Sequence, residues 1–149
     1  MRAIFLAVLL ALAACAPRPA EGPRMTSVVG YDAARFMGQW VEVATVGRAP
    51  AAGTWSIHDR EGATFFAGLP GAENVVSFID RGNGRLDFAD RTGTLYVLWA
   101  DADDRTVVLG RPDHSFGVIL NKGAGISPDR LAAARDVMEW NGYDLGTLQ

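Results

Sequence analysis

Apolar and polar residues alternate along several short segments of the chain, and the first clear case is 40–46. The alternation puts Trp40, Glu42, Ala44 and Val46 on one face and Val41, Val43 and Thr45 on the other. A period of two with β-branched residues is typical of a strand with two different faces. A glycine just before it, Gly38, lets the Trp40 ring fold against the backbone where a Cβ would intrude. The pattern therefore predicts a first strand with Trp40 in the core.

Seven further segments rich in β-forming residues follow, separated by turn signals. The predicted strands are 54–58, 63–68, 74–79, 85–89, 94–100, 105–110 and 115–121. Gly82-Asn83-Gly84 is the sharpest turn signal and is typical of a hairpin. Short, regular strands joined by hairpins indicate an antiparallel sandwich or barrel. Between residues 63 and 89 the segments are short and Gly-rich, so this region is compatible with one strand more or one fewer.

The last three predicted strands are apolar on both faces, which requires cover on both sides. A barrel with an apolar lumen and a helix packed outside would supply that cover. A helix is predicted after the last strand, because Ser127 is a suitable N-cap, Pro128 suits the first helical position and Gly142 is a C-terminal stop. Its apolar stripe suits packing against the barrel wall better than binding a partner helix.

The first thirty residues lack this pattern. Met1-Arg2 is followed by an uncharged apolar run, 3–12, which is shorter than the ~20 residues that a membrane-spanning helix needs. Residues 1–14 are therefore predicted to be a signal peptide. They are followed by a predicted flexible tether, 15–29, and a folded domain, 30–149.

The predicted signal peptide is followed by Cys15, in the sequence Leu12-Ala13-Ala14-Cys15. This sequence resembles the bacterial lipoprotein box, in which the cysteine is lipidated and becomes the first mature residue. The alternative is a chance cysteine beside an ordinary cleavage site. Since Cys15 is the single cysteine of the 149 residues, an internal disulfide is excluded.

The charged residues carry no recognisable catalytic or metal motif. The net charge is −3, with no basic patch interleaved with aromatic residues, which argues against a nucleic-acid partner. His58 and His114 are far apart in the sequence, and Asp113-His114-Ser115 is interpreted as a solvated turn. The acidic turn 101–104 lacks the spacing of an EF-hand. No catalytic residue, metal site or cofactor is therefore predicted.

Two stretches of the chain resemble the lipocalins. Residues 32–44 match the family's opening, a turn of helix leading into Gly-x-Trp, here Gly38-Gln39-Trp40. Residues 110–122 resemble the last strand, and 126–128 and 141–145 resemble the ends of the helix that follows it. The chain looks most like bacterial outer-membrane lipoprotein lipocalins and the apolipoprotein D branch. The resemblance implies an all-β fold, an eight-stranded antiparallel up-and-down β-barrel with one C-terminal α-helix packed outside.

The chain departs from the family pattern at the expected barrel floor. The family usually places an Arg over the Trp, whereas this chain has Lys122, which can make a cation–π contact without planar stacking. Asp104 stands where a Tyr is common, and the segment 40–122 is shorter than in most relatives. The expected structural motif is therefore Gly38, Trp40 and Lys122, with a looser floor and a shallower cup.

Three functions remain compatible with the sequence. The first is a membrane-anchored lipoprotein that binds, stores or transports a small hydrophobic ligand such as a fatty acid or lysophospholipid. The second is a structural or interaction lipoprotein whose barrel is filled by its own side chains, and the third is an enzyme acting on a bound lipid. Ala16 after Cys15, in place of an Asp retention signal, favours the outer membrane of a Gram-negative bacterium, facing the periplasm. Ligand identity and oligomeric state stay open.

The candidate ligand-binding wall lies on the last three strands. Side chains that share parity within each strand should face one side of the sheet. If Lys122 turns toward Trp40, the residues of the last strand with the same parity face inward. The expected wall is Leu95, Val97, Trp99, Val107, Leu109, Phe116, Val118 and Leu120.

Overall fold

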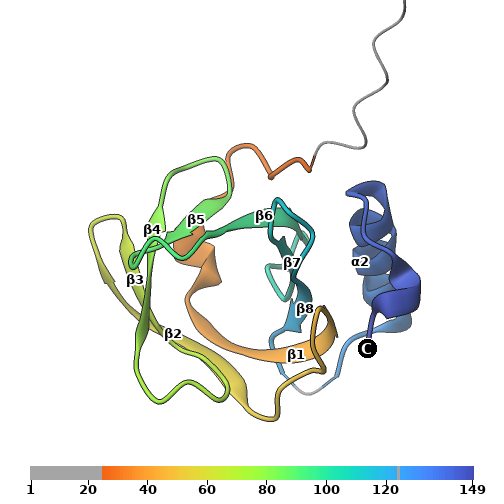
Figure 1. Ribbon diagram of the computed structural model, residues 1–149, viewed down its shortest axis with the longest axis horizontal. Coiled ribbons are helices and arrows are strands. Elements are labelled where there is room, and N and C mark those ends of the chain that lie inside the picture. The colour runs from red at the N-terminus through yellow and green to blue at the C-terminus, as the bar shows by residue number, and fades with distance from the viewer. Residues whose placement is uncertain (1–24, 124) are drawn as a thin grey trace, which may run out of the picture.

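Each strand pairs with the next one along the chain, and β8 pairs with β1 to close the ring (Figure 1). The computed structural model describes residues 25–123 and 125–149. All the pairings are antiparallel, so the predicted eight-stranded up-and-down barrel is confirmed. The strands are β1 (Gly38–Val46), β2 (Thr54–Glu61), β3 (Thr64–Gly68), β4 (Val76–Asp80), β5 (Arg85–Phe88), β6 (Thr94–Ala100), β7 (Thr106–Gly110) and β8 (Gly117–Asn121). The region 63–89, where the sequence left the number of strands undecided, thus contains three strands, β3, β4 and β5.

Within the described residues, three helices accompany the barrel: η1 (Ala33–Phe36), α2 (Pro128–Trp140) and η2 (Leu145–Thr147). The predicted start of α2 is confirmed, because Ser127 accepts a hydrogen bond from the Arg130 N–H and Pro128 occupies the first turn. After the helix, Gly142 has φ +90°, a conformation that favours glycine. Figure 1 shows α2 outside the ring, beside β6, β7 and β8.

The buried apolar residues form two clusters, one on each side of the barrel wall. The inner cluster fills the ring and contains Phe36, Trp40, Trp55, Ile57, Phe65, Ala67, Phe78, Leu86, Leu95, Val97, Val107, Leu109, Val118 and Leu120. The outer cluster lies between the wall and α2 and contains Ala44, Val46, Leu98, Val108, Ile119, Ala134, Met138 and Tyr143. The doubly apolar strands thus receive cover on both faces, as the sequence predicts.

The alternation of inward and outward side chains is interrupted within strand β1. Glu42 pairs with Leu120 and Ala44 pairs with Ile119, so one extra residue is inserted between these two pairs. Such a bulge exchanges the faces of the side chains that follow it. Trp40 is therefore in the inner cluster and Ala44 in the outer cluster, and the prediction that they share one face is wrong.

A second bulge displaces Trp99 from the predicted wall. The register of β6 against β7 shifts between Val97 and Trp99. Leu95 and Val97 stay in the inner cluster, whereas Trp99 packs against the outer cluster. The prediction that Trp99 faces inward with Leu95 and Val97 is wrong, because strict alternation does not survive a bulge.

The segment 25–29 differs from the flexible tether that the sequence predicts. The Thr26 N–H donates to Oδ1 of Asn141 over 3.0 Å, and the Val28 N–H donates to the Val97 carbonyl over 2.8 Å. Met25 packs against the outer cluster. These contacts attach 25–29 to the domain; the predicted signal peptide and residues 15–24 of the tether lie outside the described residues.

The expected motif comes together at the closed end of the barrel. The Trp40 indole N–H donates to the Phe36 carbonyl over 2.8 Å, and Nζ of Lys122 lies 4.6 Å from the Trp40 ring centroid. Lys122 also donates to the Arg35 carbonyl over 3.2 Å. Gly38 has φ +117°, and a Cβ added there would come only within 3.8 Å of Lys122, so its backbone conformation, rather than space for the Trp40 ring, favours glycine.

We predict that Trp40→Ala lowers the free energy of unfolding by about 3–5 kcal/mol, because it removes a large buried side chain and leaves a cavity. Trp140→Ala is the matched control, since Trp40 is 1% exposed and Trp140 is 80% exposed. Urea denaturation at neutral pH measures both, and the control should stay within about 0.5 kcal/mol of wild type. Equal stability of the two variants would contradict the assignment of Trp40 to the barrel floor.

Candidate functional site

The open end of the barrel lies opposite Trp40. Strand β1 begins at the closed end, so every odd-numbered strand of this antiparallel ring runs away from Trp40. The connections β1–β2, β3–β4, β5–β6 and β7–β8 therefore form the mouth. A pocket of about 330 Å³ lies among these connections, and its walls are Arg48, Trp55, Leu69, Pro70, Gly71, Ala72, Phe88, Leu95 and Phe116.

Below this pocket the barrel is occupied by its own side chains. Large residues from four different strands, Trp40, Phe65, Phe78 and Leu86, are each only 1% exposed. The rings of Phe78 and Phe88, which are partners across β4 and β5, lie 4.7 Å apart between centroids and are tilted by 47°; Phe88 lines the pocket and Phe78 is buried beside it. The space for a ligand in this conformation is therefore a cup at the mouth, at the small end of the range for ligand pockets.

A buried carboxylate, Glu42, lies behind the cup and binds two of its wall residues, Arg48 and Trp55. Its side chain is 0% exposed and projects from β1 on the same face as Trp40. It accepts hydrogen bonds from the Trp55 indole N–H and the Ala51 N–H, each over 2.7 Å. Both terminal nitrogens of Arg48 also donate to it. A buried charge needs such partners, and Glu42 therefore ties the β1–β2 connection to the barrel wall.

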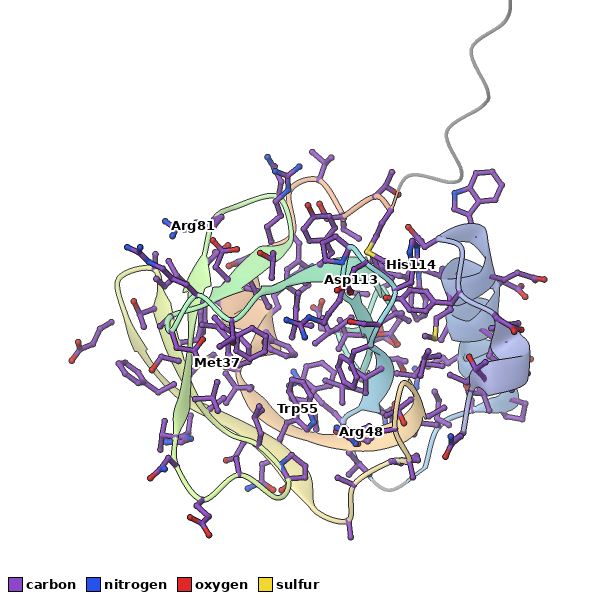
Figure 2. All side chains as sticks on the ribbon, viewed as in Figure 1. Met37, Arg48, Trp55, Arg81, Asp113 and His114 are labelled. Carbon is purple, nitrogen blue, oxygen red and sulfur yellow. The ribbon has the colours of Figure 1, made fainter. Side chains whose placement is uncertain are left out.

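Arg48 is the one cation lining the cup in the described part of the chain. Its side chain is 41% exposed, and Cζ lies 5.3 Å from the centroid of the Phe116 ring. It bridges Glu42, on the barrel wall, and Phe116, on the β7–β8 connection. Figure 2 shows Arg48 and Trp55 close to one another beside β1. The cup thus combines apolar walls with one positive group at its rim.

Burial alone would raise the pKa of Glu42. The hydrogen bonds from Arg48, Ala51 and Trp55, with the charge of Arg48, outweigh it and hold the pKa below the usual value of 4.5. The same pairing raises the pKa of Arg48, so the pair is ionised at neutral pH. The mouth wall is therefore held by an ion pair.

The β7–β8 connection is held by the C-terminal region. The Tyr143 hydroxyl donates to the Phe116 carbonyl, 2.8 Å away, with the Arg111 carbonyl at 3.2 Å. His114 lies 2.8 Å, through Nε2, from the Asn141 carbonyl. Figure 2 places Asp113 and His114 toward α2. Burial raises the pKa of Tyr143, which keeps its hydroxyl a donor.

The structure divides the predicted wall residues into three groups. Leu95 and Phe116 line the cup. Val97, Val107, Leu109, Val118 and Leu120 face inward but are fully buried in the packed lumen, and Trp99 faces α2. The sequence analysis missed Arg48, Trp55, Leu69 and Phe88. Glu42 carried a usable signal, because a carboxylate sharing a face with Trp40 requires a partner.

In the described residues, His114 does not join Asp113 and Ser115 in one hydrogen-bond network. Asp113 accepts from the N–H and the hydroxyl of Ser115, whereas His114 contacts Asn141. Asp101 and Asp103 form ion pairs with Arg130. No group of three or more His, Cys, Asp or Glu side chains that could hold a metal ion occurs in residues 25–123 and 125–149. Over the same residues, no helix has the length and apolar character needed to span a bilayer.

We predict that Glu42→Gln costs about 2 kcal/mol of unfolding free energy at pH 7, because hydrogen bonds to a charged group are lost. Since the folded-state pKa of Glu42 is lowered, its stabilisation is complete above pH 4.5 and is lost as the pH falls through that lowered value. The difference between wild type and variant, measured by urea denaturation, should therefore shrink below about pH 4.5. A difference that stays constant down to acid pH would contradict this.

Glu139→Gln is the control for this experiment. Glu139 lies on the exposed face of α2, so its replacement removes the same charge without touching the cup. The control should remain within about 0.5 kcal/mol of wild type at pH 7.

No protein-family model matches the sequence, and neither does any curated protein sequence. Solved structures do match the fold. Lipocalin 12 from rat epididymis is similar at a TM-score of 0.63 and 11% identity, over 89% of this chain and 91% of that one.

Two other solved structures are similar. Lobster apocrustacyanin A1 matches at a TM-score of 0.57 and 13% identity, over 78% of this chain and 76% of that one. The siderocalin Ex-FABP, described as functioning through dual ligand specificities, matches at a TM-score of 0.54 and 15% identity, over 76% of this chain and 91% of that one. At these identities the likeness concerns the fold, and it shows that this chain has the lipocalin fold.

Proposed function

We propose that this protein binds a small hydrophobic ligand in the cup at the barrel mouth. The observation that carries the proposal is a pocket of about 330 Å³ with apolar walls, including Trp55, Leu69 and Phe116, and a single cation, Arg48, at its rim. Pockets of this composition take apolar ligands and orient them through few polar groups. The siderocalin Ex-FABP, which shares the fold, has ligand specificities of its own.

The ligand class that fits best is a single-chain lipid with an anionic head, such as a fatty acid. Nε of Arg48 makes no hydrogen bond to the described residues, because the Arg48 bonds to Glu42 and Ala49 come from the terminal nitrogens. A carboxylate can therefore approach the guanidinium while the chain contacts the apolar walls. The packed lumen below limits how much of the chain is buried.

We further propose that the protein is lipid-anchored through Cys15 in the outer membrane of a Gram-negative bacterium, facing the periplasm. The lipoprotein-like sequence ending at Cys15 and the resemblance to bacterial lipocalins of the apolipoprotein D-like branch support this. A thioether-linked diacyl group with a further acyl chain on the amine of Cys15 would exceed the two signals needed for stable membrane attachment.

A second function, a structural or interaction lipoprotein with a closed barrel, is favoured by one observation. The lumen is filled by fully buried side chains such as Trp40, Phe65 and Phe78, as a small barrel can be. The two functions predict different results in a lipid titration: saturable binding for the first and no binding for the second.

Titration calorimetry with fatty acids of increasing length separates the two functions. Each added CH2 buried in the cup contributes about 0.8 kcal/mol, close to a fourfold gain in affinity. We expect affinity to rise with chain length to the micromolar range, then level off once the chain exceeds the cup. Fatty alcohols of the same length should bind several-fold more weakly, because they lack the charge that faces Arg48. Absence of saturable binding across the series would favour the closed-barrel function.

Leu69→Trp tests the location of the site. Leu69 is a half-buried wall residue of the cup, so an indole there should fill the cup and weaken fatty-acid binding at least tenfold. Leu148→Trp makes the same substitution at a half-buried position against the outer cluster and should bind like wild type. Equal binding by the two variants would place the ligand elsewhere.

Lipid attachment has its own test. We predict that Cys15→Ala abolishes incorporation of radioactive palmitate and leaves the protein in the soluble or uncleaved fraction. Cys15 is the single cysteine, so no other thiol can replace it. Palmitate labelling that persists in the variant would refute the anchor.

A further inference from the structure

The N-terminal segment joins the domain beside the C-terminal end of α2. Thr26 donates to Asn141, the residue after Trp140, and Met25 packs against the outer cluster. Figure 1 shows this segment passing β5 and β6 and reaching the end of α2. The ten residue steps from Cys15 to Met25 span at most about 35 Å. A bilayer that holds Cys15 therefore lies within that reach of this corner.

Two large apolar side chains are exposed here, one on the N-terminal segment and one at the helix end beside it. Trp140 is 80% exposed at the end of α2, and Val29 is 84% exposed in the N-terminal segment. The third strongly exposed apolar residue in the described ranges is Val75, at 56%, in the β3–β4 connection. Figure 1 shows β3 and β4 across the barrel from α2. Exposed apolar residues therefore lie both at the corner and on the opposite side.

A groove lies between the N-terminal segment and the neighbouring parts of the β4–β5 connection, β5 and β6. It has a volume of about 330 Å³, and its walls include Met25, Val29, Asn83, Arg85 and Tyr96. The Arg85 guanidinium lies 5.4 Å from the centroid of the Tyr96 ring. Aromatic rings, an arginine and apolar side chains together are typical of surfaces that rest at the lipid headgroup level.

We propose that this corner, formed by Val29, Arg85, Tyr96 and Trp140, is a membrane-contact surface. The Trp140 indole enters the headgroup layer, and the Arg85 guanidinium faces lipid phosphates across the groove. A weak contact of this kind suffices, because attachment at Cys15 makes it intramolecular and raises its effective concentration. The inference rests on the anchoring part of the proposed function and adds an orientation of the barrel on the bilayer.

The test uses the full chain attached through Cys15 to vesicles of phosphatidylethanolamine and phosphatidylglycerol. Protein from membranes carries its own lipid, and otherwise Cys15 is coupled to a maleimide lipid, so a failure of cellular lipidation does not affect this result. Tryptophan emission is compared in vesicles with and without brominated acyl chains, which quench indoles at short range. Trp40 and Trp55 are buried and Trp99 is half-buried against the outer cluster. Since all three are present in both proteins, the difference between wild type and Trp140→Phe isolates Trp140.

We expect bromolipids to quench most of the Trp140 emission in wild type and to remove that component in Trp140→Phe. The matched control adds Val75→Trp to Trp140→Phe, which moves the exposed indole across the barrel, and its emission should not be quenched. Fatty-acid titration of Trp140→Phe in solution should equal wild type, which keeps this test separate from that of the cup.

Three results would overturn the membrane-contact surface. The first is an unquenched Trp140, and the second is equal quenching of the Val75→Trp control. The third is a blue shift of Trp140 emission that follows protein density on the vesicle rather than lipid composition. That result would assign the corner to contact with a second copy of the chain.

Discussion

Trp40 is the residue on which the closed end of the barrel depends. Its ring is enclosed by Phe36 at 5.5 Å between centroids and by the Lys122 ammonium, and its N–H bonds back to the Phe36 carbonyl. It thereby joins η1, the first strand and the residue that follows the last strand. In a closed barrel these are the elements that meet at the seam, so one side chain fixes where the ring closes.

The packing of side chains in the lumen also follows from the closure of eight strands into a barrel. Eight strands enclose a lumen just wide enough for side chains, and this chain places aromatic residues there from β1, β2, β3 and β4. What stays open is the mouth, where Glu42 replaces an apolar residue on the inner face. Its hydrogen bonds with Arg48, Ala51 and Trp55 attach the β1–β2 connection to the barrel wall. The pair with Glu42 thus holds Arg48 at the rim, where it supplies the positive charge of the cup.

The sequence predicts strand order, most turns, the helix and the meeting of Trp40 with Lys122, because each depends on local patterns or a family resemblance. The sequence does not predict which side chains point into the barrel, because that depends on the register between neighbouring strands. The bulges after Glu42 and after Val97 exchange inner and outer faces, and no local signal marks them, so Trp99 was assigned to the wrong side. The role of Arg48 was not predicted, because a turn residue gives no sequence signal of the residue that it will bind, here Glu42. The cup itself depends on four connections whose spacing no pattern encodes.

The hydrogen bond from Tyr143 to the Phe116 carbonyl joins the rim of the cup to the C-terminal end of the chain. The backbone there is crowded, since a Cβ added to Gly117 would lie 2.7 Å from Met138 and 2.9 Å from Tyr143. Outward movement of the rim would therefore require the helix end to yield as well. A substitution at Met138 or Tyr143, on the far side of the barrel wall, is therefore expected to shift the position of Phe116 at the rim.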